Sequence, residues 1–534
     1  MNLAILAAVS FLCMLCSCHK GSDISRESSS HNSSIRLNIG EDPSTLDPRK
    51  ARSLCDRTLM NMLYEGLTRI NKEEKVAPAL AQVIEVSSDL MCYTFYLRDA
   101  YWTNGEKIKA SDFCYAWKKI LDPKFAAPNA FQLYPIKNAR LVKTGAISPS
   151  ALGVEIVDDQ TLKVYLEQPV PYFLELTAFP AFFPVCESWD RENPDWMEKE
   201  NLAIACGPFR LKKWKHNHEI EVVKNESYWD EATVKIHAIS MYMLKEETEM
   251  RMFEKKELDW LGSPLSNIPI DAIKTIKNDS QLKTKALLGT YFLRLNTHQS
   301  VLKNTCIRKA LSIAIDRRSI VDHVLQGNQA PATGLVPSVM GIQRNPYFHD
   351  HDIEEAKSLF KKGLLELKIE PKDFPVLSMI FPTGEKNYLL SQAIQEQWHE
   401  TLGIKVQIQA VEKKVYFDQL ANQSYDMAAG SWIADFNDPI NFLEVFKFKE
   451  ASTNNTHWEN EKYKKLLDES CALSDPEERK ALLSSAEAIL MKEMPIVPVF
   501  YYNMLYTQQN HLKEIVLSSM GNLDFKWAHL ENAN

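Results

Sequence analysis

Two histidine pairs, His216/His218 and His349/His351, have a spacing that could bind a metal ion. Alternate residues of a β-strand project from the same face, so either pair could offer two imidazole ligands. Such pairs are more often solvated surface residues, and no HExxH zinc motif occurs in the chain. We therefore expect neither a metal site nor a cofactor.

Glycine spacing argues against nucleotide chemistry. The chain has 17 glycines, and the closest of them, Gly327, Gly334 and Gly341, follow one another seven positions apart. The dinucleotide fingerprint, the P-loop and the nucleophile elbow all need glycines closer together than this. No acid–base couple and no serine or cysteine nucleophile is recognisable either. We predict that the protein is not an enzyme; the alternative is a peptidase, which peptide turnover would reveal.

The composition is that of a globular protein, with 45% hydrophobic and 25% charged residues over 534 positions. The 62 Lys and Arg residues against 70 Asp and Glu residues give a net charge of −8. Nucleic-acid binders usually carry a basic surface, and each membrane span needs ~20 mostly apolar residues. The composition therefore excludes a multi-span membrane protein and argues against a nucleic-acid partner.

The N-terminus is typical of an export signal. Leu3 to Leu15 form an apolar run of signal-peptide length, and the Leu-Cys-Ser-Cys segment at its end resembles a bacterial lipobox. We predict a lipoprotein signal peptide over residues 1–17 and lipidation of Cys18, because a small residue precedes Cys18 whereas a leucine precedes Cys16. Met1 to Ala4 lack the usual basic residues, so an uncleaved anchor or a cytosolic protein with an apolar start is the alternative.

A serine-rich segment follows the predicted lipidation site. Seven of the sixteen residues from His19 to Ser34 are serine, and such a segment cannot bury enough apolar surface to offset the entropy of ordering it. We predict a flexible tether over residues 18–34 between a lipid and the folded body. The expected location is the periplasm, or the extracytoplasmic face of a bacterial cell membrane.

The rest of the chain has an α/β (α+β) pattern without repeats. Alternating apolar residues predict a hairpin over Val154 to Leu166, and a helix over Ser391 to Leu402 leads through Gly403 into a strand. Amphipathic spacing also predicts a helix over Arg57 to Leu67 and a single helix over Arg308 to Val324. Helix, short turn and strand in succession indicate an α/β layer.

Four sequence blocks, in order along nearly the whole chain from Ile35, carry a resemblance to a known family. They are Tyr101–Phe113, then Cys206–Leu211 with Trp214 and Asn225–Trp229, then Asn304–Arg317, and finally Ser431–Pro439. Together they resemble the peptide/nickel class of ABC-transporter solute-binding proteins. The last block is most similar to the oligopeptide-binding members of that class.

The resemblance implies a two-lobed periplasmic-binding-protein fold of class II, with a hinge and an extra domain. The ligand of such a protein lies between the lobes and is enclosed as they close. By match, lobe I combines residues 35–53, 184–289 and 503–534, the extra domain spans 54–183, and lobe II spans 290–502.

The resemblance also implies a function: capture of oligopeptides and delivery, as a monomer, to a membrane permease with a separate ATPase. Ser431, Trp432 and Ile433 match the strand that pairs with the peptide backbone. Asp435 matches the aspartate that pairs with the peptide's α-ammonium group. From the residues alone, a cap or turn role is favoured for Asp435, and core packing explains Trp432 equally well.

Arg52, Leu54 and Asn129 complete the expected ligand-binding set, with departures from the family. Oligopeptide-binding members carry a glutamate where Arg52 stands and a tyrosine where Asn129 stands. Ala429 and Asn387 occupy the places of an arginine and a histidine that can receive a peptide's carboxylate. The family's residue for the peptide's amine is therefore present in this chain, whereas its residues for the peptide's carboxylate are replaced. This predicts a shifted length preference or a modified ligand such as a cell-wall peptide. A separate alternative is a binder of a non-peptide solute, such as a metal chelate or haem, on the same scaffold; such a ligand would not need Asp435.

Overall fold

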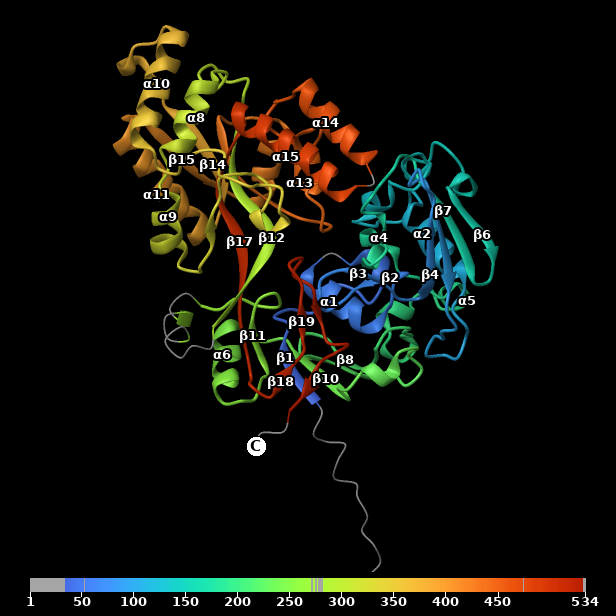
Figure 1. Ribbon diagram of the computed structural model, residues 1–534. Helices are drawn as coiled ribbons and strands as arrows, with labels where there is room; N and C mark the ends of the chain where they lie inside the picture. Colours follow the sequence, from blue (N-terminus) through green and yellow to red (C-terminus); the bar gives the residue numbers. More distant parts are fainter. Residues whose placement is uncertain are drawn as a thin grey trace, which may run out of the picture.

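The structure is a computed structural model that describes residues 34–51, 53–269, 272–273, 276, 282–473 and 475–531. Cys18, the predicted signal peptide, nearly all of the serine-rich tether and Arg52 lie outside the described residues. Figure 1 shows a part at the upper left coloured yellow to red, a part at the right coloured blue to teal, and a lower part that combines blue, green and red segments. The lower part is therefore assembled from stretches far apart in the sequence.

The lower part contains a four-stranded sheet in the order β1–β10–β9–β8. β1 pairs in parallel with β10, and its alternation buries Ile35 and Leu37 completely. Helix α6 and two short strand pairs lie in the same part of the molecule (Figure 1). The bounds are β1 (Ser34–Asn38), β8 (Phe209–Lys215), β9 (Glu219–Lys224), β10 (Ala238–Tyr242), α6 (Glu246–Glu254), β18 (Leu512–Lys513) with β21 (His529–Leu530), and β19 (Val516–Leu517) with β20 (Leu523–Asp524).

Residues 54–183, the predicted extra domain, contain a second four-stranded sheet in the order β4–β5–β7–β6. The hairpin expected from the sequence is confirmed as β6 and β7, and helix α2 buries Phe113 and Trp117 completely. The bounds are β2 (Thr68–Ile70), β3 (Val76–Pro78), β4 (Ala81–Val86), β5 (Cys92–Leu97), α2 (Ala110–Ile120), α3 (Ala139–Lys143), β6 (Val154–Asp158), β7 (Thr161–Tyr165) and α4 (Phe173–Leu176), with α5 (Glu187–Glu192) beyond them.

The sequence predicts a helix over Arg57 to Leu67, and the structure has helix α1 over Leu54–Leu63. The prediction of a helix is confirmed, but both of its predicted ends are wrong. The helix begins early because Ser53 and Asp56 form a capping box: Ser53 Oγ accepts from the Asp56 N–H, and the Asp56 carboxylate accepts from the Ser53 N–H, both at 3.0 Å. The chain leaves the helix at Tyr64 and packs Gly66 closely, since a Cβ there would lie 2.5 Å from the Thr177 carbonyl oxygen.

The upper-left part is built on a seven-stranded sheet with the main order β11–β17–β12–β16–β14–β15. β12 and β17, thirteen residues each, pair antiparallel and run from the lower part into the upper one (Figure 1). Their register breaks between Ala286 and Thr290. The bounds are β11 (Trp260–Gly262), β12 (Lys283–Leu295), β13 (Ala330–Pro331, paired with β17), β14 (Leu377–Pro382), β15 (Val406–Val411), β16 (Met427–Ile433) and β17 (Ile496–Gln508).

The single helix predicted over Arg308 to Val324 is wrong. α8 ends at Ile313, and the Asp316 carboxylate accepts from the Ser319 N–H at 2.8 Å, which starts a new helical segment. The bounds are α8 (Thr305–Ile313), α9 (Arg317–Ser319) with a π-helical turn (Ile320–Leu325), α10 (Ile353–Leu367), α11 (Glu385–Leu402), α12 (Lys413–Ala421), α13 (Ile440–Leu443), α14 (Glu461–Cys471) and α15 (Pro476–Glu493). Within the described residues no helix is long and apolar enough to cross a membrane.

Candidate ligand-binding site

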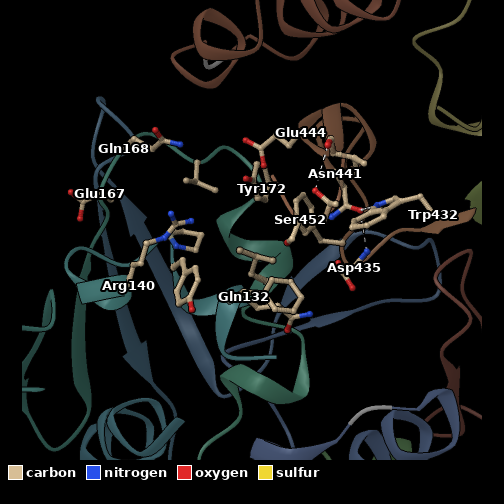
Figure 2. Close-up of a pocket in the computed structure, with 18 of the residues that line it drawn as sticks. Gln132, Arg140, Glu167, Gln168, Tyr172, Trp432, Asp435, Asn441, Glu444 and Ser452 are labelled. Atoms are coloured by element: carbon tan, nitrogen blue, oxygen red, sulfur yellow. Dashed lines mark hydrogen bonds between the residues drawn. The ribbon is translucent and has the colours of Figure 1, made fainter. Parts of the chain in front are cut away.

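A cleft of about 1050 Å³ separates the predicted extra domain from the predicted lobe II. Figure 2 shows Trp432, Asp435 and Asn441 on one side of it and Arg140, Glu167 and Gln168 on the other. The residues that line it are Phe131, Gln132, Tyr134, Pro135, Asn138, Arg140, Leu141, Glu167, Gln168, Val170, Tyr172 and Leu176 from one wall, and Trp432, Asp435, Phe436, Asn441, Glu444, Val445, Ser452 and Thr453 from the other.

Strand β16 brings the predicted peptide-pairing residues to this cleft. β14 pairs with β16 only at Met427 and Ala428, whereas β12 pairs with the whole strand. On the side away from β12, the stretch from Ala429 to Ile433 therefore has no strand partner among the described residues. Ser431 and Ile433 are exposed on this stretch. An exposed strand edge of this kind can accept an extended peptide as a further strand.

A single amide holds Trp432 and Asp435 in place. Asn441 Oδ1 accepts from Trp432 Nε1 at 2.8 Å and from the Asp435 N–H at 3.2 Å. Asn441 is buried at the first turn of α13, immediately after the Asn437–Pro439 turn. Asn441 was not predicted from the sequence, although it stands only six residues after Asp435, just beyond the same turn.

The Asp435 carboxylate has no hydrogen-bond donor and no ion pair among the residues that the structure describes. Burial raises its pKa, and the positive charge of Arg57 opposes this shift. Burial lowers the pKa of Arg57 in turn, and the charge of Asp435 opposes that shift. A partly buried carboxylate without a partner favours a cationic ligand group, because pairing would offset the cost of keeping the charge away from water.

Leu54 and Asn129 do not line the cleft. Asn129 Nδ2 donates to the Ala51 carbonyl at 2.8 Å, which ties the loop before α1 to the extra domain. Leu54 is the first residue of α1 and packs beside Gly521. Of the predicted ligand residues, the structure thus brings Trp432 and Asp435 into the cleft wall and Ser431 and Ile433 onto the adjoining strand edge.

The positions expected at the carboxylate end carry no cation in this structure. Ala429 is buried at 3% exposure, and Asn387 Nδ2 donates to the Pro382 carbonyl at 3.0 Å. Arg294 of β12 is paired with Ala428 of β16; its guanidinium lies 4.9 Å from the centre of the Phe292 ring and fills the space beside Gly430. Sequence spacing alone could not indicate Arg294, because it comes from another strand.

An aromatic contact joins the two walls of the cleft. The rings of Tyr172, from the predicted extra domain, and Phe436, from the turn after β16, stack with centroids 4.2 Å apart and planes 6° apart. Two residues after Phe436, Asp438 pairs with Arg479, with Arg479 Nη1 and an Asp438 carboxylate oxygen 2.6 Å apart. Tyr172 lies 264 positions before Phe436 in the chain, so this contact also could not be predicted from spacing.

The comparison with protein families settles the class of the protein. The family model described as bacterial extracellular solute-binding proteins, family 5 (middle region), matches residues 75–454. The chain belongs to this family. Its members bind solutes and are not enzymes, so the predictions of a solute-binding protein, of an extracellular family and of no enzymatic activity are confirmed.

Individual relatives cover nearly the whole chain. Oligopeptide-binding protein OppA of Bacillus subtilis is 38% identical over 513 residues, which are 95% of this chain and 94% of that protein. An unliganded open form of MppA, a periplasmic murein tripeptide binding protein, has a TM-score of 0.82 at 29% identity and covers 93% of this chain and 97% of its own. Haemophilus influenzae OppA in complex with the peptide RPPGFSPFR has a TM-score of 0.74 at 27% identity, with coverages of 93% and 99%. The α/β fold and the family resemblance are therefore confirmed.

Proposed function

We propose that this solute-binding protein captures oligopeptides in the cleft beside β16 for an ABC importer. The observation that carries the proposal is the unpartnered Asp435 carboxylate next to the unpaired edge of β16. The edge offers backbone groups to a peptide main chain, and the carboxylate offers a counter-charge to a free α-ammonium group. The names of the relatives, which include oligopeptide-binding and dipeptide-binding proteins, support this ligand class.

This arrangement suits a protein that must bind many sequences. All peptides share backbone N–H and C=O groups and charged termini, and strand addition satisfies the backbone groups without reading the side chains. The cleft leaves space for side chains of different size, and water in such space can absorb differences in shape and polarity. The lining is mixed, with aromatic residues such as Phe131 and Tyr134 beside polar residues such as Gln132 and Ser452.

Binding in this proposal closes the cleft by rotation about β12 and β17. The higher TM-score to an unliganded open form, 0.82, than to a peptide complex, 0.74, supports a ligand-free arrangement of the lobes here. The register break between Ala286 and Thr290 lies where β12 passes from the lower part to the upper one, close to the boundary proposed at residues 289/290. We place the hinge at this break, because fewer backbone hydrogen bonds resist bending where the register of a strand pair is interrupted.

The same proposal includes a lipid on Cys18, a tether over residues 18–34 and delivery of the peptide, by a monomer, to a permease. ATP hydrolysis belongs to a separate subunit, which agrees with the glycine spacing that excludes a P-loop. The changed residues at the carboxylate end, Ala429 and Asn387, favour a cell-wall peptide or another non-standard ligand as the alternative cargo within this cleft.

Native mass spectrometry of the folded body, purified from a cell lysate and then denatured, tests the proposal. We expect a mixture of released peptides, whose length range would show whether the loss of the carboxylate partners matters. A single non-peptide mass, or a cleft that no peptide library can fill, would contradict the assignment.

A further inference from the structure

Glu444 is a second carboxylate of the cleft that has no direct partner. It lines the same wall as Asp435 and is half-buried, in the 3-10 turn (Glu444–Phe446) that continues α13. Among the residues that the structure describes, none donates a hydrogen bond to its carboxylate or forms an ion pair with it. Burial raises the pKa of Glu444, because its charge is held partly away from water.

The basic groups of the protein that act on Glu444 are already engaged. Lys447 and Arg479 are the cations whose charges reach it. Lys447 Nζ lies 2.7 Å from an Asp468 carboxylate oxygen, and Arg479 pairs with Asp438. The charges of these two aspartates offset those of the two cations, so a cation that pairs directly with Glu444 is left for a ligand to supply.

The position of Glu444 relative to Asp435 suits two positive charges on one short stretch of peptide. Asn441 Oδ1 accepts from the Asp435 N–H at 3.2 Å, and Glu444 follows Asn441 by three positions. Residues three apart on a helix have Cβ atoms about 5–6 Å apart. Figure 2 shows all three side chains on one wall of the cleft. One residue of extended peptide spans about 3.3–3.6 Å, so an α-ammonium group on Asp435 leaves the side chains of the first few residues within reach of Glu444.

The described residues that line the cleft carry more negative than positive charge. They include three carboxylates, on Glu167, Asp435 and Glu444, and one guanidinium, on Arg140. Glu167 accepts from the Asn138 N–H at 2.9 Å, whereas the other two carboxylates have no such donor. An ammonium group on Asp435 would balance only one of these two. Keeping the other charged in a cleft that has closed is costly unless a second cation pairs with it.

We propose that Glu444 is a specificity-determining residue, which selects peptides with a basic side chain among their first three residues. Its carboxylate accepts from the ammonium group of a lysine or the guanidinium of an arginine, while Asp435 pairs with the α-ammonium group. Hydrogen bonds between two charged groups are the strong ones, and the apolar stem of either side chain can lie along aromatic lining such as Tyr172. The inference rests on the proposed function, because it assumes a peptide whose amine is on Asp435.

Titration calorimetry of the wild type and of Glu444→Gln tests the inference. The probes are alanine pentapeptides with one lysine at the first, second or third position, and the same peptides with norleucine, which keeps the stem without the charge. We expect the wild type to bind the best lysine peptide roughly tenfold more tightly than its norleucine counterpart, as one charge-assisted hydrogen bond would give. Glu444→Gln should remove this preference by weakening the lysine peptide alone. Glu444→Asp keeps the charge and should keep part of the preference.

Glu461→Gln is the matched control, because it removes the same charge from the predicted lobe II at a side chain that is 84% exposed on α14. The preference should persist in this variant, and its loss there would trace it to net charge and overturn the inference. Equal affinity of the wild type for lysine and norleucine peptides overturns it, as does an equal loss for both in Glu444→Gln. These results leave the proposed function intact, whereas a wild type that binds no peptide overturns both.

Discussion

In the proposed function, the Asp435 carboxylate supplies the negative charge that pairs with a peptide amine in the cleft. Asp435→Asn keeps the shape of the side chain and removes the charge. We expect the affinity for a pentapeptide with a free amine to fall by about 2–5 kcal/mol, because the ammonium group would lose its buried counter-charge. Titration calorimetry measures this, with the exposed Asp322→Asn as the control. Unchanged affinity would return Asp435 to the role of a turn residue.

The ionisation of Asp435 also predicts a pH dependence. Burial raises the pKa of Asp435, and only the ionised carboxylate pairs with an ammonium group. Affinity should therefore fall as the pH is lowered, starting at a higher pH than the ordinary aspartate pKa of about 3.9 would give. Because the Arg57 charge lowers this pKa, Arg57→Gln should move the midpoint upward. Calorimetry between about pH 7 and about pH 4 checks both statements. The same midpoint pH in the wild type and in Arg57→Gln would show that the charge of Arg57 does not act on Asp435.

At the scale of elements, the turn between β16 and α13 depends on Asn441. Asn441→Leu has a similar volume but leaves Trp432 Nε1 and the Asp435 N–H without their shared acceptor. A lost buried hydrogen bond costs about 1–3 kcal/mol, and we expect peptide affinity to fall roughly tenfold while the charge of Asp435 remains. Asn437→Ala, an exposed position in the same turn, is the control for calorimetry and thermal melting. A variant with normal affinity would show that the turn holds its shape without this amide.

Elements that owe their form to adjacent residues could be predicted from the sequence. The hairpin over β6 and β7 is an example, since its alternation and its turn act within a few positions. The binding roles expected for Ser431 to Pro439 came from the family resemblance instead. The start of α1 needed Ser53 and Asp56 to be recognised as a capping box, and the break after α8 needed the capping role of Asp316. Tyr172 could not be assigned to the cleft, because only the folded chain brings it against Phe436.

At the scale of the whole molecule, the stack of Tyr172 on Phe436 joins the two walls of the cleft, and we predict that it limits how far they separate. The stack is present in a structure that resembles an unliganded open form, so it acts before any ligand arrives. Aromatic pairs contribute about 0.5–1.5 kcal/mol beyond their buried area. Loss of the stack would thus shift the populations of open and more closed arrangements by a factor of roughly 2–10.

Phe436→Leu tests this without removing the apolar bulk. We expect the radius of gyration of the ligand-free protein, measured by small-angle X-ray scattering, to increase, because the stack joins Tyr172 to the turn after β16. Peptide affinity should fall by the same factor of roughly 2–10, since a wider cleft must close further for each binding event. Phe417→Leu is the matched control, because Phe417 is an exposed ring on α12 at 55% exposure. If Phe436→Leu changes neither the radius nor the affinity, the stack packs the turn locally and the hinge at β12 and β17 alone sets the opening.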